Sequence, residues 1–131
     1  ARNSLELEIG EVMGPESLRE LRVFVDGVYM DPKIEEYIVS LVDASRHADR
    51  WGIPIANWIH YGASPRATIY LGITAKAHAL LAGRAYVTPL DIKSMAPDVL
   101  RHRIILSYEA EAEGKSPEEL IAQILDNVPV P

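Results

Sequence analysis

The sequence predicts an all-α fold: a small bundle of about four to five helices with one short extended segment near residues 104–108. Capping residues followed by proline favour the first turn of a helix, and they occur at four places. These are Asp31-Pro32, Ser64-Pro65, Thr88-Pro89 and Ser116-Pro117. Apolar residues also recur at spacings of three and four, and 48% hydrophobic residues in 131 are enough for one compact core.

Two helices are expected in the first third of the chain. The first has a weak start at Gly14-Pro15-Glu16, and the second begins at Asp31-Pro32 and ends near residues 46–48. Apolar residues follow both starts at helical spacing. They are Leu18, Leu21, Phe24 and Val25 in the first helix and Ile34, Tyr37, Ile38, Leu41 and Val42 in the second.

Residues 47–61 show no clean periodicity and are interpreted as a loop, for which a functional insertion is one interpretation. The stretch is rich in apolar residues, which must pack somewhere. Trp51 and Trp58 either form an exposed interaction loop or close the small core, and we favour core packing because aromatic side chains bury a large area.

The helix that follows Ser64-Pro65 is expected to be central. It runs through Ile69, Ile73, Ala77, Leu80 and Leu81, and its many alanines allow close packing. Ser64 is predicted to be the N-cap and Pro65 the first helical residue. Gly83 is predicted to end the helix in the left-handed conformation, and Arg84 to extend its stem along the surface, with an intersubunit contact as the alternative.

The last third begins with a helix after Thr88, in which Pro97 restarts or kinks the chain. Residues 104–108 are β-prone, 109–114 read as an acidic turn, and a final helix starts at Pro117. Asp91 and Glu119 stand three residues after Thr88 and Ser116, the spacing of a capping box. Helices therefore account for most of the chain.

Composition excludes several classes of protein. The net charge of −6 and the pI of about 5.2 argue against nucleic acid as a partner. The absence of cysteine excludes disulfides and thiolate metal sites, and cytoplasm is the expected compartment. No stretch approaches the roughly 18 apolar residues of a membrane span. The chain also starts at Ala1 without a methionine, so we expect an excised fragment.

The common catalytic motifs are also missing. There is no Gly-x-x-x-x-Gly-Lys-Ser/Thr loop and no apolar strand that ends in paired acids, so the chain alone cannot turn over ATP. The four histidines are scattered rather than set at ligand spacing, so no metal site is predicted. There is no Gly-x-Ser-x-Gly elbow for a serine nucleophile.

Arg66 is the candidate functional residue. It follows Ser64-Pro65 in the first turn of a long helix, where the positive end of the helix dipole makes a cation unfavourable by roughly 0.3–1 kcal/mol unless an anion binds. A phosphate would satisfy the arginine and the helix end together. The equally weighted alternative is a surface arginine that only happens to follow a cap, with or without an ion pair to a nearby acid.

The basic segment Arg101-His102-Arg103 is interpreted differently. Both arginines lie at the end of a short helix, where cations complement the dipole, so a structural role is favoured. For His102, the role of a satisfied packing residue is one interpretation.

Three ordered motifs resemble the C-terminal lid of the MoxR family of AAA+ ATPases. They are Gly62-Ala63-Ser64-Pro65-Arg66-Ala67, Gly83-Arg84-Ala85-Tyr86-Val87-Thr88-Pro89-Leu90-Asp91-Ile92 and Val99-Leu100-Arg101-His102-Arg103-Ile104. The resemblance extends to residues 37–42 and 108–114. It implies that residues 15–131 are the lid and residues 1–14 a linker from a missing ATPase core.

The resemblance further implies that Arg66 is the sensor-2 arginine, which reaches the γ-phosphate of ATP held by the core. Ala63, Ser64 and Pro65 would line the nucleotide pocket beside it. The full-length protein would be an ATP-hydrolysing enzyme that uses ATP and Mg²⁺ and assembles into a homo-oligomeric ring, typically a hexamer. It would act as a chaperone that matures a client metalloenzyme, with partners that carry von Willebrand factor A domains.

Residues 47–61 depart from this pattern, because the stretch is longer and more apolar than is typical before the sensor-2 helix. A displaced helix start would keep Arg66 from the phosphate, whereas a lengthened loop packed over the lid, which we favour, would not. The alternative function is a free-standing helical protein-interaction module without nucleotide binding.

Overall fold

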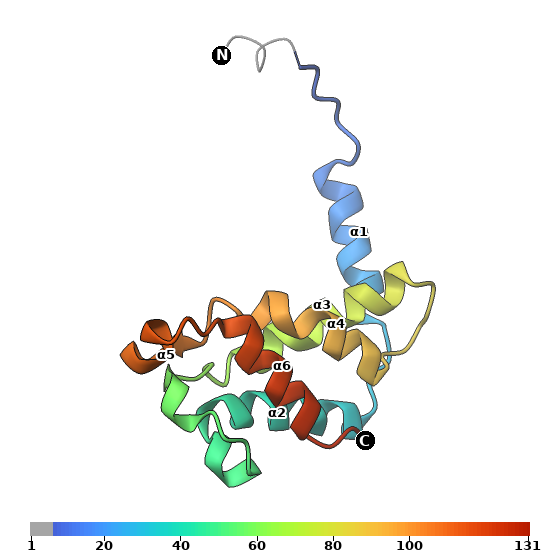
Figure 1. Cartoon of the computed structure of the whole chain (residues 1–131). Helices are drawn as coiled ribbons and strands as arrows, with labels where there is room; N and C mark the ends of the chain where they lie inside the picture. Colours follow the sequence, from blue (N-terminus) through green and yellow to red (C-terminus); the bar gives the residue numbers. More distant parts are fainter. Residues whose placement is uncertain (1–6) are drawn as a thin grey trace.

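The computed structural model describes residues 7–131 and confirms a helical bundle with one small pair of strands (Figure 1). The described part contains six α-helices, α1 to α6, and two 3₁₀ turns. The helices are α1 Pro15–Asp26, α2 Pro32–Arg46, α3 Ala67–Leu81, α4 Pro89–Leu100, α5 Tyr108–Ala112 and α6 Pro117–Asn127. Residues 1–6 of the predicted linker 1–14 lie outside the described residues.

The additional helix, α5, corrects the prediction of an acidic turn over residues 109–114. Ser107 caps this helix, because its hydroxyl oxygen accepts a hydrogen bond of 3.2 Å from the Ala110 N–H. Gly114, with a φ of +72°, follows the helix in the left-handed conformation that glycine adopts readily.

The extended segment predicted near 104–108 is a strand, β2 (Ile105–Leu106). It pairs antiparallel with β1 (Ile59–Tyr61), and Ile59 faces Leu106 across the pair. The partner strand lies inside the stretch 47–61 that the sequence indicated only as a loop. This pairing joins that stretch to the C-terminal third of the chain.

The core lies between α2, α3, α4 and α6, and α3 is central, as predicted (Figure 1). The buried side of α3 is lined by residues four apart: Ala67, Leu71, Ala75 and Ala79. Small side chains there let α4 approach closely. The expected apolar side was wrong in part, since Ile69 and Ile73 are 60% and 49% exposed. α4 continues through Pro97 without a break in the helix.

α1 differs from the other helices because none of its residues is buried. α1 projects from the bundle, and the lower end of α1 in Figure 1 contacts α3. Leu18, Val23 and Phe24 are between 53% and 71% exposed on it. Within residues 7–131, no helix is long and apolar enough to cross a membrane.

Candidate functional site

Arg66 lies at the N-terminal end of α3, in a tight turn that leads into the helix. The first α3 amides donate to carbonyls three residues back: Ala67 N–H to Ser64 at 2.9 Å, and Ile69 N–H to Arg66 at 3.0 Å. The predicted Ser64 cap is therefore wrong, because the N-cap position is Arg66 and no side chain caps the helix. These first amides are already used, so an anion here would be bound mainly by side-chain charge and the helix dipole.

The Arg66 side chain is exposed, and within residues 7–131 it has no ion pair and no hydrogen bond. No ion pair of Arg66 with a nearby acid is therefore present in the part of the chain that the structure describes. Ser64 and Pro65 are exposed beside it. Ala63 is fully buried, so its methyl group belongs to the core and its contribution would be to position the turn.

The start of α3 is fixed to the end of α2 by Ser45. The Ala63 N–H donates to the Ser45 hydroxyl oxygen at 3.0 Å, and that hydroxyl donates to the Val42 carbonyl at 2.7 Å. Gly62 packs so tightly on the Ser45 carbonyl that a Cβ at this position would overlap it. Both ends of the stretch 47–61 therefore meet at one point, where the end of α2 is held against the turn before α3.

The rest of that stretch, which we call the insertion (residues 47–61), folds back onto the bundle. Ile53 and Ile55 are buried in the core, and the Trp51 indole N–H donates to the Asp43 carboxylate at 2.9 Å. Trp58 packs partly against the core, and its ring lies 5.4 Å from the Lys115 ammonium. The predictions of core packing and of a loop packed over the bundle are confirmed.

The basic segment after α4 divides into two roles. Arg101 forms ion pairs with Asp98 at 2.8 Å and with Glu118 at 2.9 Å, and the bond to Asp98 is the main cause that raises its pKa. Arg103 donates to the Val99 carbonyl at 2.7 Å, which confirms a structural role for both arginines. The Arg103 guanidinium also lies 4.7 Å from the centre of the Tyr70 ring. Tyr70 lies one helical turn after Arg66.

The other end of α3 carries a closed polar cluster that sequence reasoning missed. Asp91 is fully buried, yet its carboxylate accepts from Arg84 at 2.5 and 2.6 Å and from the Thr88 N–H at 2.7 Å. His78 Nδ1 lies 2.6 Å from the same carboxylate. Arg84 thus forms an ion pair with the buried Asp91, and the prediction that its stem extends along the surface was wrong. In the sequence, the capping-box spacing of Thr88 and Asp91 indicated that Asp91 bonds to Thr88. It did not indicate that Arg84 and His78 contact the same carboxylate.

These contacts determine the ionisation of Asp91. Burial by itself would raise the pKa of the carboxyl group, but the hydrogen bonds from Arg84, Thr88 and His78 together lower it well below its ordinary value. Asp91 is therefore a carboxylate that joins the end of α3 to the start of α4. Such a fully paired group is suited to holding two helices together.

Among residues 7–131, no three His, Cys, Asp or Glu side chains come together as a possible metal site.

Comparison with known proteins defines the class. The profile of the AAA lid domain family matches residues 55–124. A solved structure, described as that of a putative ATPase from Cytophaga hutchinsonii, superposes with a TM-score of 0.86 at 44% identity over 88% of this chain and 36% of that one. The chain belongs to the AAA lid domain family.

Two curated relatives narrow the class further. Chaperone MoxR1 of Mycobacterium tuberculosis is 34% identical over 122 residues, which is 92% of this chain and 32% of that protein. The uncharacterized protein YeaC of Bacillus subtilis is 38% identical over 92% of this chain and 35% of its own length. This lid matches the C-terminal region of MoxR-family proteins. The chain spans about a third of the length of these relatives.

Proposed function

We propose that this domain is the nucleotide-sensing lid of a MoxR-type AAA+ ATPase. Arg66 contacts the γ-phosphate of ATP that is bound by another domain of the full-length protein, and this contact couples the state of the nucleotide to the position of the lid. The observation that carries the proposal is the exposed Arg66 side chain, unpaired among residues 7–131, on a helix start that Ser45 holds in place.

The neighbouring residues have separate parts in this proposal. Ser64 and Pro65 are exposed on the same turn and lie where a nucleotide approaching Arg66 would meet them. Ala63 is buried and holds the turn through its N–H. The positive side chain and the dipole of a helix of 15 residues suit a polyphosphate. Mg²⁺ would be bound with ATP by the core domain.

The wider role follows from the relatives. The full-length protein would hydrolyse ATP as a homo-oligomeric ring, typically a hexamer, in the cytoplasm. Its lid movements would drive chaperone-like maturation or remodelling of a client enzyme, together with proteins that carry von Willebrand factor A domains. MoxR1, which is described as a chaperone, supports this part of the proposal.

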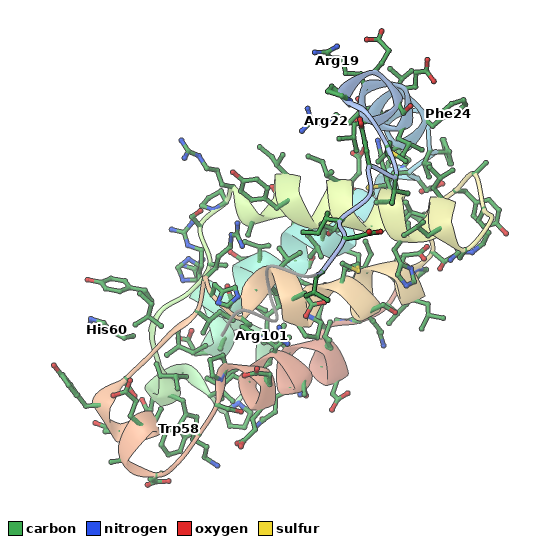
Figure 2. The ribbon with its side chains drawn as sticks, turned by 90° about the horizontal axis from the view of Figure 1, so that it is seen from above. Arg19, Arg22, Phe24, Trp58, His60 and Arg101 are labelled. Atoms are coloured by element: carbon green, nitrogen blue, oxygen red, sulfur yellow. The ribbon has the colours of Figure 1, made fainter. Side chains whose placement is uncertain are left out.

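The test is the substitution Arg66→Ala in the full-length protein, with ATP turnover as the readout. We expect a loss of about 10²–10³-fold, the usual effect of removing one donor to a developing charge. Arg22→Ala is the matched control, because Arg22 is an exposed arginine on α1, away from the start of α3 (Figure 2). Unchanged turnover in the Arg66 variant, with the fold intact, would reject the sensor role.

One observation favours a second function, a helical protein-interaction module. The apolar residues of α1 are exposed, and they could bind a partner without any nucleotide. In that case Arg66→Ala would leave turnover unchanged, whereas Phe24→Ala would weaken binding of the partner.

A further inference from the structure

A hollow of about 340 Å³ opens beside the turn that carries Arg66. It lies where the end of α2, both ends of the insertion and the turn before α3 meet. Its lining contains no acidic residue within the part of the chain that the structure describes. The lining residues are Arg46, His47, His60, Tyr61, Gly62, Ser64 and Pro65.

Arg46 is the strongest charge in this lining. It is the last residue of α2 and is exposed, and no carboxylate among residues 7–131 pairs with it. Its favourable position at the C-terminal end of a helix explains why a cation is tolerated there. Arg66 follows Ser64 and Pro65 on the adjoining turn and is also exposed without an ion pair among residues 7–131. Two positive side chains and no acid in the lining favour an anion at this place.

The geometry of these two helix ends is set by the backbone. A Cβ at Gly62 would collide with the Ser45 carbonyl and come very close to the Arg46 amide nitrogen, so the chain on either side of the hollow is in direct contact. The Ala63 to Ser45 hydrogen bond fixes the same junction. The backbone on both sides of the hollow is therefore preorganised, which lowers the entropy cost of binding a ligand there.

The insertion adds two imidazoles at its ends, His47 and His60. His60 stands on β1, its ring 4.2 Å from that of Tyr61, and projects from the bundle (Figure 2). His60 also borders a second hollow, whose lining contains Glu109 and Glu111. The acids thus belong to that second hollow, whereas the lining of the first contains only basic and neutral residues.

We propose that Arg46 is a second phosphate-binding residue and that the hollow takes part of the polyphosphate chain of the nucleotide. This inference rests on the proposed function, since it places the same ligand next to Arg66. The planar guanidinium of Arg46 binds two phosphate oxygens at once, and His47 and His60 contribute further N–H donors. The insertion then enlarges the phosphate-binding surface of the lid.

The experiment is a titration of the 131-residue chain with inorganic tripolyphosphate, followed by the amide NMR signals of Arg46, Gly62 and Ser64. We expect saturable shifts at these residues and weaker ones with inorganic monophosphate. Arg46→Ala should weaken tripolyphosphate binding by about tenfold or more, the value of one hydrogen bond to a charged group. Arg22→Ala removes the same charge from α1 and should leave the affinity within about twofold.

Three results would separate the inference from the proposed function. If the unsubstituted chain shows no saturable shifts, or if Arg46→Ala and Arg22→Ala bind equally well, the inference is overturned. If it is overturned while Arg66→Ala still lowers ATP turnover, the proposed function stands without it. If Arg46→Ala weakens binding while Arg66→Ala changes neither binding nor turnover, the hollow is an anion site and the sensor role is what fails.

Discussion

The charged side chains at the two ends of α3 differ: those at one end are paired around a buried carboxylate, and those at the other end are exposed and unpaired among residues 7–131. At the C-terminal end, Asp91 is buried and Arg84, His78 and Thr88 all contact its carboxylate. At the N-terminal end, Arg46 and Arg66 are exposed without a partner among residues 7–131. A buried charge is costly unless it is fully paired, whereas an exposed one remains available to a ligand. The paired charges at the C-terminal end therefore stabilise the fold, whereas the exposed arginines at the N-terminal end are accessible to a ligand.

The largest expected effect is on the stability of the paired end. Asp91→Asn keeps the shape of the side chain but leaves Arg84 without its counter-charge, and we expect unfolding to become easier by about 2–4 kcal/mol. Urea denaturation measures this change. A loss below about 0.5 kcal/mol, the range of ordinary surface substitutions, would show that the cluster does not stabilise the fold.

The second effect is a steric clash where Gly62 contacts Ser45, beside the N-terminal end of α3. Gly62→Ala would place a methyl group against the Ser45 carbonyl, and we expect a cost of about 1–3 kcal/mol together with weaker tripolyphosphate binding. Gly72→Ala is the matched control, since nothing lies within 4 Å of a Cβ at Gly72. In the interior of α3 this change should stabilise by up to about 1 kcal/mol. Equal effects of the two substitutions would contradict the tight contact at Gly62.

The pH dependence of stability sharpens the role of Asp91. Although burial opposes it, hydrogen bonding lowers the pKa of this carboxyl group in the folded state. A lowered pKa stabilises the fold at pH values above the unfolded value of about 4, and the contribution is lost as the pH falls below it. The stability difference between the unsubstituted chain and Asp91→Asn should thus shrink on acidification from pH 5. A difference that stayed constant would mean that the charge of Asp91 is not involved.

The smallest effect is expected where the charges are unpaired. Arg46→Ala and Arg66→Ala each remove an exposed side chain with no described ion pair, so the midpoint of thermal unfolding should stay nearly constant, with stability changed by less than about 0.5 kcal/mol. A large loss of stability from either substitution would assign that arginine to the fold instead of to a ligand.

Local signals in the sequence were enough for most of the helices. The proline-associated starts at Asp31, Thr88 and Ser116 are all present, and the side chains of Asp31 and Ser116 accept from backbone amides as expected. Gly83 has a φ of +79°, and the Arg84 N–H closes the end of α3 on the Ala79 carbonyl. These features depend on neighbouring residues only, which is why the sequence predicts them.

The sequence-based predictions were wrong where the local structure depends on contacts between residues that are far apart in the chain. α3 has apolar residues on every side, so the sequence pattern could not tell that the alanines rather than Ile69 and Ile73 face the core. The tight turn before α3 replaced the expected Ser64 cap because Ala63 is tied to Ser45, 18 residues earlier. Arg84 meets Asp91 only after α3 and α4 have packed. For the site, the sequence pointed to Arg66 but not to the hollow, whose walls come from three separate segments.

The contact between Gly62 and Ser45 also bears on how much this domain can change in length. Since the insertion leaves and re-enters the bundle at one point, the gap that its ends must span does not grow when residues are added. The entropy of closing a loop rises only with the logarithm of its length, about 0.6 kcal/mol per doubling. Gly52, exposed with a φ of +69°, marks a turn where a peptide tag or a fluorescent reporter could be inserted while α2 and α3 keep their spacing.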